Sequence, residues 1–268
     1  MTTLEKTLKE APRHTGYILT IVILVFVILI WSLTTINLEN VDEKGFQIAK
    51  SIIGGIFNPD MSLFNWTKES VPYLLVETLA IAFLGTIVGA FLSIPFAFLA
   101  ASNIVPQPVS WLTRLILIII RTIPALVYGL MFIRVTGPGP FAGVLTVGLA
   151  SIGMLAKLFV DAIEELDVKV LESMTSIGCT TFEKIRYGIF PQLLAIFLSV
   201  TIYRFDMNLR DAATLGLVGA GGIGAPLIFA VRSYKWEQVG SILIGLVVLV
   251  LVIEVFSNMI RGKLVKGS

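Results

Sequence analysis

Hydrophobic residues are grouped along the chain into six long blocks, separated by shorter segments that carry most of the charges. An α-helix needs about 20 mainly apolar residues to cross a bilayer, and the blocks are close to that length. They are residues 16–36, 74–100, 112–133, 141–160, 192–209 and 239–260. The pattern therefore predicts an all-α polytopic membrane protein with about six transmembrane helices. Polar residues follow the first block in place of the small residues of a signal cleavage site, so we interpret it as a retained span.

Two of the blocks contain residues that indicate contacts inside a helix bundle. In the second block, Gly85 and Gly89 form a GxxxG pair, which lets two helices approach closely in lipid. In the third block, Pro124 removes a backbone donor and disfavours helical geometry at Ile123. Arg121 in the same block would cost at least about 2.5–3.5 kcal/mol at the bilayer centre. We therefore expect Arg121 at the cytoplasmic boundary or facing the bundle interior.

Residues 161–191 form the longest polar island between apolar blocks in the second half of the chain. Apolar side chains recur there every three or four positions, which predicts one amphipathic helix. They are Ile163, Leu166, Val170, Leu171, Met174 and Ile177. Gly178 stands where a helix C-terminus favours a left-handed residue, and Thr180 with Glu183 predicts a capping box for a second helix. Pro191 then begins the next apolar block, where a missing donor is tolerated.

The spacing of Glu172, Gly178 and Pro191 resembles the cytoplasmic coupling motif of permease subunits of ATP-binding-cassette (ABC) importers. In that family, the short helix docks in a groove of the ATPase subunit. The resemblance implies a coupling role for Glu172, Ser173, Gly178, Cys179, Thr180 and Pro191. An ordinary polar loop that is helical by chance is the alternative.

Four positions in this segment depart from the family pattern. Ser173 and Met174 replace two alanines, and Gly188 and Phe190 stand where Ile and Leu are usual. The departures concern the detail of docking more than the placement of the segment.

Composition supports the membrane assignment and restricts the chemistry. Of the 268 residues, 56% are hydrophobic and 14% are charged, against about 25% charged residues in a soluble domain. One cysteine, Cys179, excludes an internal disulfide framework, and one histidine, His14, gives no zinc site or His relay. The net charge of +2 does not indicate nucleic acid. An intramembrane enzyme is therefore the least favoured function.

An even number of spans would place both termini on the same side of the membrane. Lys and Arg residues number nine on the side of the termini and of residues 161–191, and seven on the opposite side. The positive-inside rule then predicts cytoplasmic termini, in a prokaryotic cytoplasmic membrane given the family resemblance. The expected regions are a tail over 1–15, a first span and external loop over 16–71, the transporter domain over 72–260, and a tail over 261–268.

The end of the fifth block holds a second group of candidate residues. Asp206 precedes Arg210 by four positions, the favourable order for an ion pair on a helix, and Arg204 lies on another face. An ionisable residue within or at the end of a span is a functional hypothesis by default. An ion pair that only fixes helix packing is the alternative.

The segment that follows, residues 208–237, is rich in glycine and is predicted to be too polar to cross the membrane. Its glycines favour tight turns and exposed amides, which suits either a bound anion or a re-entrant gate at the outer mouth. They are Gly219, Gly221, Gly222 and Gly224. A plain structural turn is the alternative. The spacing is neither a dinucleotide fingerprint nor a Walker A loop, so a separate ATPase has to supply ATP hydrolysis.

Three segments, in this order, resemble phosphonate importer permeases: RTIPALV at 121–127, YRFDMNLR at 203–210 and LGLVGAGGIG at 215–224. With the coupling motif, the resemblance covers roughly residues 72–260. It implies the type I ABC importer permease fold, a phosphonate or related phosphorus oxyanion as substrate, and an extracytoplasmic binding protein that delivers it. It also implies a second permease subunit, identical or paralogous, and two ATPase subunits that bind ATP and Mg, with no cofactor in this chain.

The charge, glycine and family arguments together give one set of candidate residues for the substrate path or gate. They are Arg121, Pro124, Arg204, Asp206, Asn208, Arg210, Gly219, Gly221, Gly222 and Gly224. The same machine carrying another small solute, such as methionine, remains open. An ion-coupled secondary transporter is less favoured, because that class predicts internal repeats, and the first span and the loop after it have no counterpart in the second half.

Overall fold

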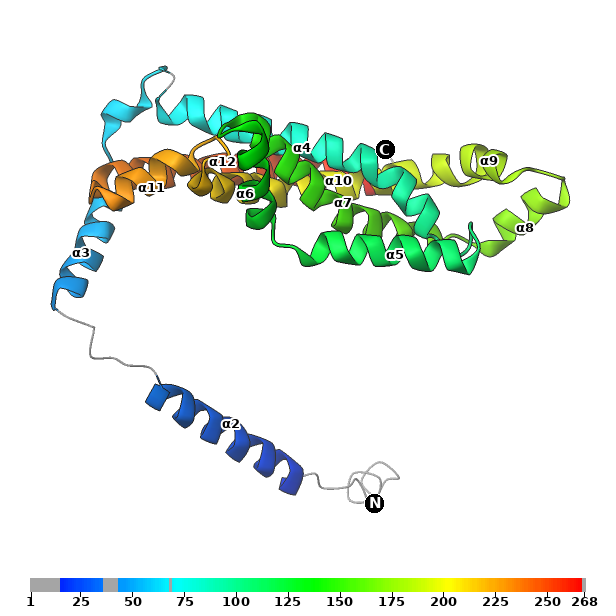
Figure 1. Ribbon diagram of the computed structural model, residues 1–268, viewed down its shortest axis with the longest axis horizontal. Coiled ribbons are helices and arrows are strands. Elements are labelled where there is room, and N and C mark those ends of the chain that lie inside the picture. Colours follow the sequence, from blue (N-terminus) through cyan, green and yellow to red (C-terminus); the bar gives the residue numbers. More distant parts are fainter. Residues whose placement is uncertain (1–14, 36–42, 68, 267–268) are drawn as a thin grey trace. The chain divides into compact units, whose positions relative to one another are not determined.

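The computed structural model describes residues 15–35, 43–67 and 69–266, and within these ranges it contains helices and no strands (Figure 1). The chain divides into two compact units, residues 1–50 and 51–268. The first unit contains α2 (Thr15–Thr35) and the beginning of α3 (Glu43–Phe57). The apolar side chains of α2 are exposed around the whole helix, as expected of a span surrounded by lipid. The predicted first span is thus confirmed to residue 35, and residue 36 lies outside the described residues.

The second unit contains the other helices. They are η2 (Met61–Phe64), α4 (Val71–Ala100), α5 (Gln107–Thr122), α6 (Ala125–Thr136), α7 (Pro140–Glu164), α8 (Val168–Ser176), α9 (Thr181–Glu183), η3 (Lys184–Ile189), α10 (Phe190–Leu215), η4 (Gly216–Val218), α11 (Gly224–Arg232) and α12 (Trp236–Lys266). Among the described residues, five helices are long and apolar enough to cross a membrane, or up to six if α5 and α6 form one broken span. The predicted fold class, an all-α protein with about six transmembrane helices, is confirmed.

The predicted GxxxG contact lies between α4 and α7 at the centre of the second unit. A Cβ atom added at Gly85 would lie 2.7 Å from the Cβ of Val147, and one at Gly89 would lie 2.7 Å from the Cβ of Ser151. The two backbones therefore meet more closely than larger residues would allow. Further along the same helices, Phe159 stacks on Phe197 of α10 with ring centroids 4.2 Å apart. These contacts make α4, α7 and α10 the rigid centre of the bundle.

The third apolar block forms two helices, so residues 112–133 are not one continuous helix, and the interruption predicted at Pro124 is confirmed. α5 and α6 are bent by 84° relative to one another. The break falls where the sequence places it: Ile123 is extended and Pro124 is the N-cap of α6. The hydroxyl of Tyr128 donates to the carbonyl of Ile120 across the bend at 3.0 Å. This bond helps to hold the bend, and periodicity alone does not reveal it.

The fifth block is longer than predicted. The helix does not end at Leu209 but continues to Leu215, so residues 208–215 are not part of a polar loop. It is also continuous at its start, because α9, η3 and α10 together form one helical stretch from Thr181 to Val218. Pro191 lies in the first turn of α10, as predicted, although helical residues already precede it. A π turn over Lys184–Ile189 precedes it, and such a turn is one way for a helix to accommodate an interrupted hydrogen-bond ladder.

The segment before α4 is attached to the start of α12. The amide of Asp60 donates to the carbonyl of Glu237 at 3.2 Å, and the hydroxyl of Ser241 donates to the carbonyl of Asp60 at 3.0 Å. The Asp60 carboxylate accepts the hydroxyl of Ser62 at 2.6 Å and its amide at 3.0 Å. These bonds place the pKa of Asp60 below its ordinary value. This end of the bundle lies opposite α8 and α9 (Figure 1).

Candidate functional site

The predicted coupling segment contains a break that the sequence did not indicate. α7 ends at Glu164 and α8 begins at Val168, so a single amphipathic helix through residues 163–177 is wrong. Ile163 is fully buried in α7, whereas the side chain of Ile177 is 78% exposed. Asp167 starts the new helix by accepting the amide of Lys169 at 3.0 Å. The N-cap at Asp167 therefore starts a separate helix, although the apolar residues keep their helical spacing across the break.

The turn after α8 has the predicted geometry. Gly178 has a positive φ of 84°. Its amide donates to Thr175 at 3.0 Å, and the amide of Cys179 donates to Met174 at 3.0 Å, which together form a Schellman motif. Thr180 and Glu183 form the capping box that begins the next helix. The turn is therefore fixed by backbone bonds on both sides.

Two of the four departures from the family's coupling motif, Met174 and Gly188, lie against each other. A Cβ atom at Gly188 would overlap the sulfur of Met174. The larger residue on α8 therefore occupies the space that the smaller residue on η3 leaves open. Through this contact, α8 rests directly on the helix that continues into α10.

The surface of the coupling segment is apolar as well as charged. Ile177, Phe182 and Tyr187 have side chains that are 78%, 67% and 65% exposed. Glu172 and Ser173 are exposed on α8, and Cys179 is half-buried in the turn. Exposed apolar groups rimmed by polar residues are typical of a protein interaction surface.

A buried polar cluster joins α4, α7 and α10. The amide nitrogen of Asn208, which is fully buried, donates to the hydroxyls of Thr86 and Ser151 at 2.8 Å each. Arg204 is 7% exposed; its Nε donates to Ser151 at 3.4 Å, and its Nη2 lies 3.4 Å from Asp211. Arg204 therefore faces the interior of the bundle. Each of these helices thus contributes a polar side chain to one buried site.

The predicted ion pair on α10 is also present. Nη2 of Arg210 donates to Oδ2 of Asp206 at 2.7 Å. Oδ1 of Asp206 and Oδ1 of Asn208 are buried and have no hydrogen-bond partner among the described residues. Unsatisfied buried acceptors are costly, so this part of α10 carries polar groups beyond what packing alone requires.

The glycine loop does not offer its amides to an external anion as expected. Gly219, Gly221 and Gly222 have the predicted positive φ values of 95°, 84° and 74°. The amide of Gly222, however, donates to the carboxylate of Glu77 at 2.7 Å, and the amide of Ile223 donates to the hydroxyl of Thr78 at 2.9 Å. A side chain of α4 therefore already occupies the anion position.

The glycine loop and Arg204 are also not brought together. Arg204 lies eleven residues before the end of α10 at Leu215, which is about 16 Å along an α-helix. A Cβ at Gly216 would lie 2.6 Å from the amide nitrogen of Gly224, so the loop is closely packed at its base. Arg204 therefore belongs to the interior of the bundle, Arg210 is exposed on α10, and the loop belongs to the end opposite α8 and α9 (Figure 1).

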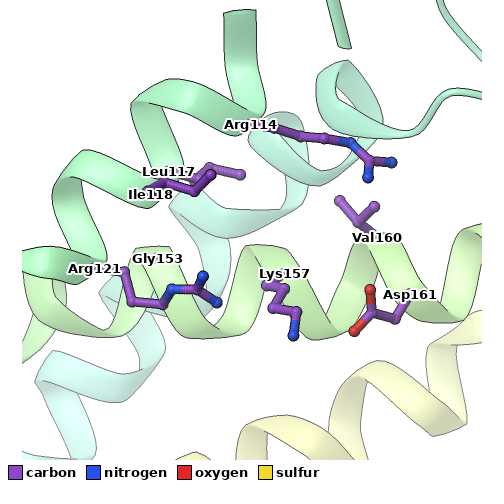
Figure 2. A pocket seen from close by; sticks show the side chains of 8 residues that line it. All are labelled: Arg114, Leu117, Ile118, Arg121, Gly153, Lys157, Val160 and Asp161. Atoms are coloured by element: carbon purple, nitrogen blue, oxygen red, sulfur yellow. The ribbon is translucent and has the colours of Figure 1, made fainter. Parts of the chain in front are cut away.

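Arg121 lies at the end of α5, one residue before that helix stops at Thr122. Its side chain points toward α7 near Gly153 and Lys157 (Figure 2). Lys157, Glu77, Thr86 and Ser151 are not among the site residues predicted from the sequence. For Lys157 there was a signal, because Gly153, Lys157 and Asp161 recur every four residues on one helix face. The other three are recognisable only from contacts between helices.

Comparison with known proteins places these features in a family. Residues 93–267 match the model of the binding-protein-dependent transport system inner membrane component family. The chain belongs to this family. The match includes only the end of α4, but the whole coupling segment and all of α10, so the coupling turn and the polar cluster except Thr86 lie within the shared region. It is a multi-pass membrane protein, and its relatives are transport permease subunits.

Several relatives of the permease have described transport roles. The phosphite transport system permease protein PtxC of Stutzerimonas stutzeri is 33% identical over 220 residues, covering 81% of this chain and 78% of the relative. The phosphate-import permease protein PhnE of Mycolicibacterium smegmatis is 37% identical over 190 residues, covering 70% of this chain and 36% of the relative. The putative cryptic phosphonate transport system permease protein PhnE2 of Escherichia coli is 34% identical over 109 residues, covering 41% of this chain and 89% of the relative.

Solved structures confirm the fold. A chain of the inward-facing MetNI methionine ABC transporter has a TM-score of 0.62 at 22% identity, covering 71% of this chain and 94% of that chain. A chain of an amino acid ABC transporter has a TM-score of 0.54 at 19% identity, covering 84% and 96%. The permease therefore has the type I ABC importer fold that the family resemblance implied.

Proposed function

We propose that this chain is the membrane-spanning permease subunit of an ABC importer that carries a phosphorus oxyanion, of the phosphite, phosphate or phosphonate kind. The observation that carries the proposal is the 33% identity to a phosphite permease over 81% of this chain. A cationic side chain inside the bundle supports it, because Arg204 is almost fully buried. The likeness to the methionine transporter, at 22% identity, supports the fold and not the substrate.

The proposed machine contains a second permease subunit, two ATPase subunits that bind ATP and Mg, and an extracytoplasmic binding protein. The exposed apolar side chains around Gly178 would be covered by an ATPase subunit. This assignment puts α8, α9 and both termini in the cytoplasm of a prokaryotic cell. The glycine loop then lies at the outer mouth, where a binding protein delivers the anion.

The structure suggests how movement at the ATPase would reach the pathway. The coupling turn continues into one helical stretch from Thr181 to Val218. That stretch contains Arg204 and Asn208, and it ends beside the glycine loop. A tilt applied at Gly178 is therefore carried by a stiff helix to both the polar cluster and the loop. In this proposal, α10 switches between two arrangements against α4 and α7. The buried bonds from Asn208 to Thr86 and Ser151 belong to one of them.

The direct test is transport by the complete complex. The permease is purified with its ATPase, reconstituted into vesicles with the binding protein, and supplied with ATP. Uptake and ATP hydrolysis are measured with phosphite, phosphate, methylphosphonate, methionine and sulfate. We expect one or more of the phosphorus oxyanions to be accumulated and to stimulate hydrolysis. Accumulation of methionine with no response to any phosphorus compound would contradict the proposal.

A further inference from the structure

A cavity of about 150 Å³ lies between α5 and α7, apart from the polar cluster and the coupling turn. Its walls carry three cations, Arg114, Arg121 and Lys157, together with the carboxylate of Asp161 and apolar side chains (Figure 2). A cavity of this volume has room for about ten water molecules. It therefore accommodates a tetrahedral oxyanion together with part of its hydration shell.

Gly153 explains why Arg121 enters this cavity. A Cβ atom at Gly153 would lie 3.0 Å from the Cβ of Arg121 and 3.2 Å from its backbone nitrogen. Because Gly153 has no side chain, α5 approaches α7 closely at this point, and the Arg121 guanidinium extends along α7 (Figure 2). Lys157 follows Gly153 by four residues and so lies on the same helix face. The two cations thus share one space, although they come from different helices.

The charges in the cavity are not balanced. Arg114 is paired with Glu164 at 2.5 Å, and Glu164 also accepts the amide and hydroxyl of Ser102 at 2.7 and 2.6 Å. Within the described ranges, neither Arg121 nor Lys157 has an ion-pair partner closer than 4.0 Å. Asp161 is the additional acid, so two cations face one carboxylate. Such an excess is costly against lipid, which favours a hydrated cavity.

On the basis of the proposed function, we propose that this cavity is a transient binding site for a free phosphorus oxyanion on its way through the permease. The planar guanidinium of Arg121 matches two oxygens of the anion, and the ammonium of Lys157 supplies a point charge. Asp161 lies four residues closer to the end of α7 that leads to α8. Its carboxylate repels the anion there, which keeps the affinity low enough for release toward the coupling side.

Charge-selective labelling tests the site without relying on transport. Ile118 lines the cavity and is 52% exposed, so Ile118→Cys in a Cys179→Ser background gives this chain a single reporter thiol within the complete complex. We expect an anionic methanethiosulfonate reagent to react faster than a cationic one, and phosphite to slow the reaction. Lys157→Gln should abolish both effects, whereas Lys263→Gln, at an exposed position on α12, should preserve them. Equal rates for the two reagents, or no reaction with either, would refute the site.

An anionic lipid headgroup has the same chemistry as the free anion, so the labelling is repeated in vesicles of two compositions. One contains only phosphatidylcholine, and the other also contains phosphatidylglycerol. Protection by phosphite in both compositions supports a site for the free anion. Protection that requires phosphatidylglycerol and does not respond to phosphite would assign the cavity to lipid and overturn the proposal.

Uptake then separates this inference from the proposed function. In a wild-type complex that imports phosphite, Arg121→Gln or Lys157→Gln should lower uptake about tenfold, the effect of losing one charged hydrogen bond. Arg121→Lys and Lys157→Arg should recover part of the rate, and Arg134→Gln should serve as a matched arginine control. Normal uptake by both glutamine variants would refute the site alone. If wild type imports no phosphorus oxyanion, the proposed function fails, while the labelling result still reports on the cavity.

Discussion

The carboxylate of Glu77 accepts the amide of Gly222 at 2.7 Å, and this bond joins the first half of α4 to the glycine loop. The next amide, that of Ile223, is held by Thr78 at 2.9 Å. Two consecutive side chains of one helix thus hold two consecutive amides of a loop that is distant in sequence. The loop is therefore an ordered structure attached to α4, not a loose connection.

We expect Glu77→Ala to release the glycine loop. Loss of a hydrogen bond to a charged group costs about 1.5–3 kcal/mol. Because the loop lies at the proposed outer mouth, its release should raise ATP hydrolysis without binding protein and lower uptake for each ATP consumed. Glu77→Gln retains an acceptor and should have a smaller effect. Glu69→Ala, at an exposed position just before α4, is the matched control; equal coupling ratios in Glu77→Ala and Glu69→Ala would argue against this role.

Substitution of Gly178 should damage the coupling turn. The positive φ of 84° costs a residue with a Cβ roughly 1–2 kcal/mol, and a β-branched residue more than alanine. We therefore expect Gly178→Val to weaken association of the permease with its ATPase, and Gly178→Ala to do so less. Co-purification of the two subunits measures this. Gly262→Ala, on a helix with open space around it, should leave association unchanged; wild-type transport by Gly178→Val would remove the turn from the mechanism.

Met174 and Gly188 should behave as a coupled pair. Gly188→Ile alone overfills the space beside the Met174 sulfur, and overpacking typically costs about 1–3 kcal/mol. Met174→Ala alone leaves a gap. The double substitution Met174→Ala with Gly188→Ile restores the residue types that are usual in the family motif and should recover much of the stability. Thermal unfolding of the purified complex gives the four values of the cycle, and strictly additive effects would show that the two side chains do not depend on each other.

Local signals were predictable from the sequence because they involve neighbours in the chain. The Gly178 turn, the Thr180–Glu183 capping box and the break at Pro124 each depend on residues within a few positions. The 84° angle at Pro124 was not predictable, since it depends on where α6 packs. The break before α8 was missed because the apolar period continues across it.

Features that depend on contacts between helices were not predictable. The charged end of α10 was predicted to leave the membrane, but the side-chain amide of Asn208 donates to the hydroxyls of Thr86 on α4 and Ser151 on α7. The glycine amides were expected to be open, but their acceptors lie on α4, 145 residues away in sequence. A single sequence gives no information on such distant partners.

Asn208→Leu should destabilise the bundle more than its size change implies. The substitution removes the donor to Thr86 and Ser151 and buries a branched side chain between them. Loss of a buried hydrogen-bond partner costs about 1–3 kcal/mol, so the complex should unfold at a lower temperature. Asn208→Asp changes the two bonds with little change in volume and provides a comparison of similar shape. An unchanged unfolding temperature in Asn208→Leu would mean that the cluster is not a stabilising contact between the helices.

The orientation of the permease can be tested with two thiols at opposite ends of the same unit. Cys179 lies in the coupling turn and is half-buried. Ala225, at the start of α11, is exposed, whereas Ala220 in the glycine loop is only 1% exposed and a poor reporter. We expect Ala225→Cys with Cys179→Ser to react with a membrane-impermeant maleimide added outside intact cells, and native Cys179 to react only in inverted vesicles.

Because α10 connects the two ends through one continuous helix, the two thiols must react from opposite sides of the membrane if that helix crosses it. Labelling of both thiols from one side would refute the crossing, and exchange of the two sides would place the coupling turn outside and exclude its contact with a cytoplasmic ATPase.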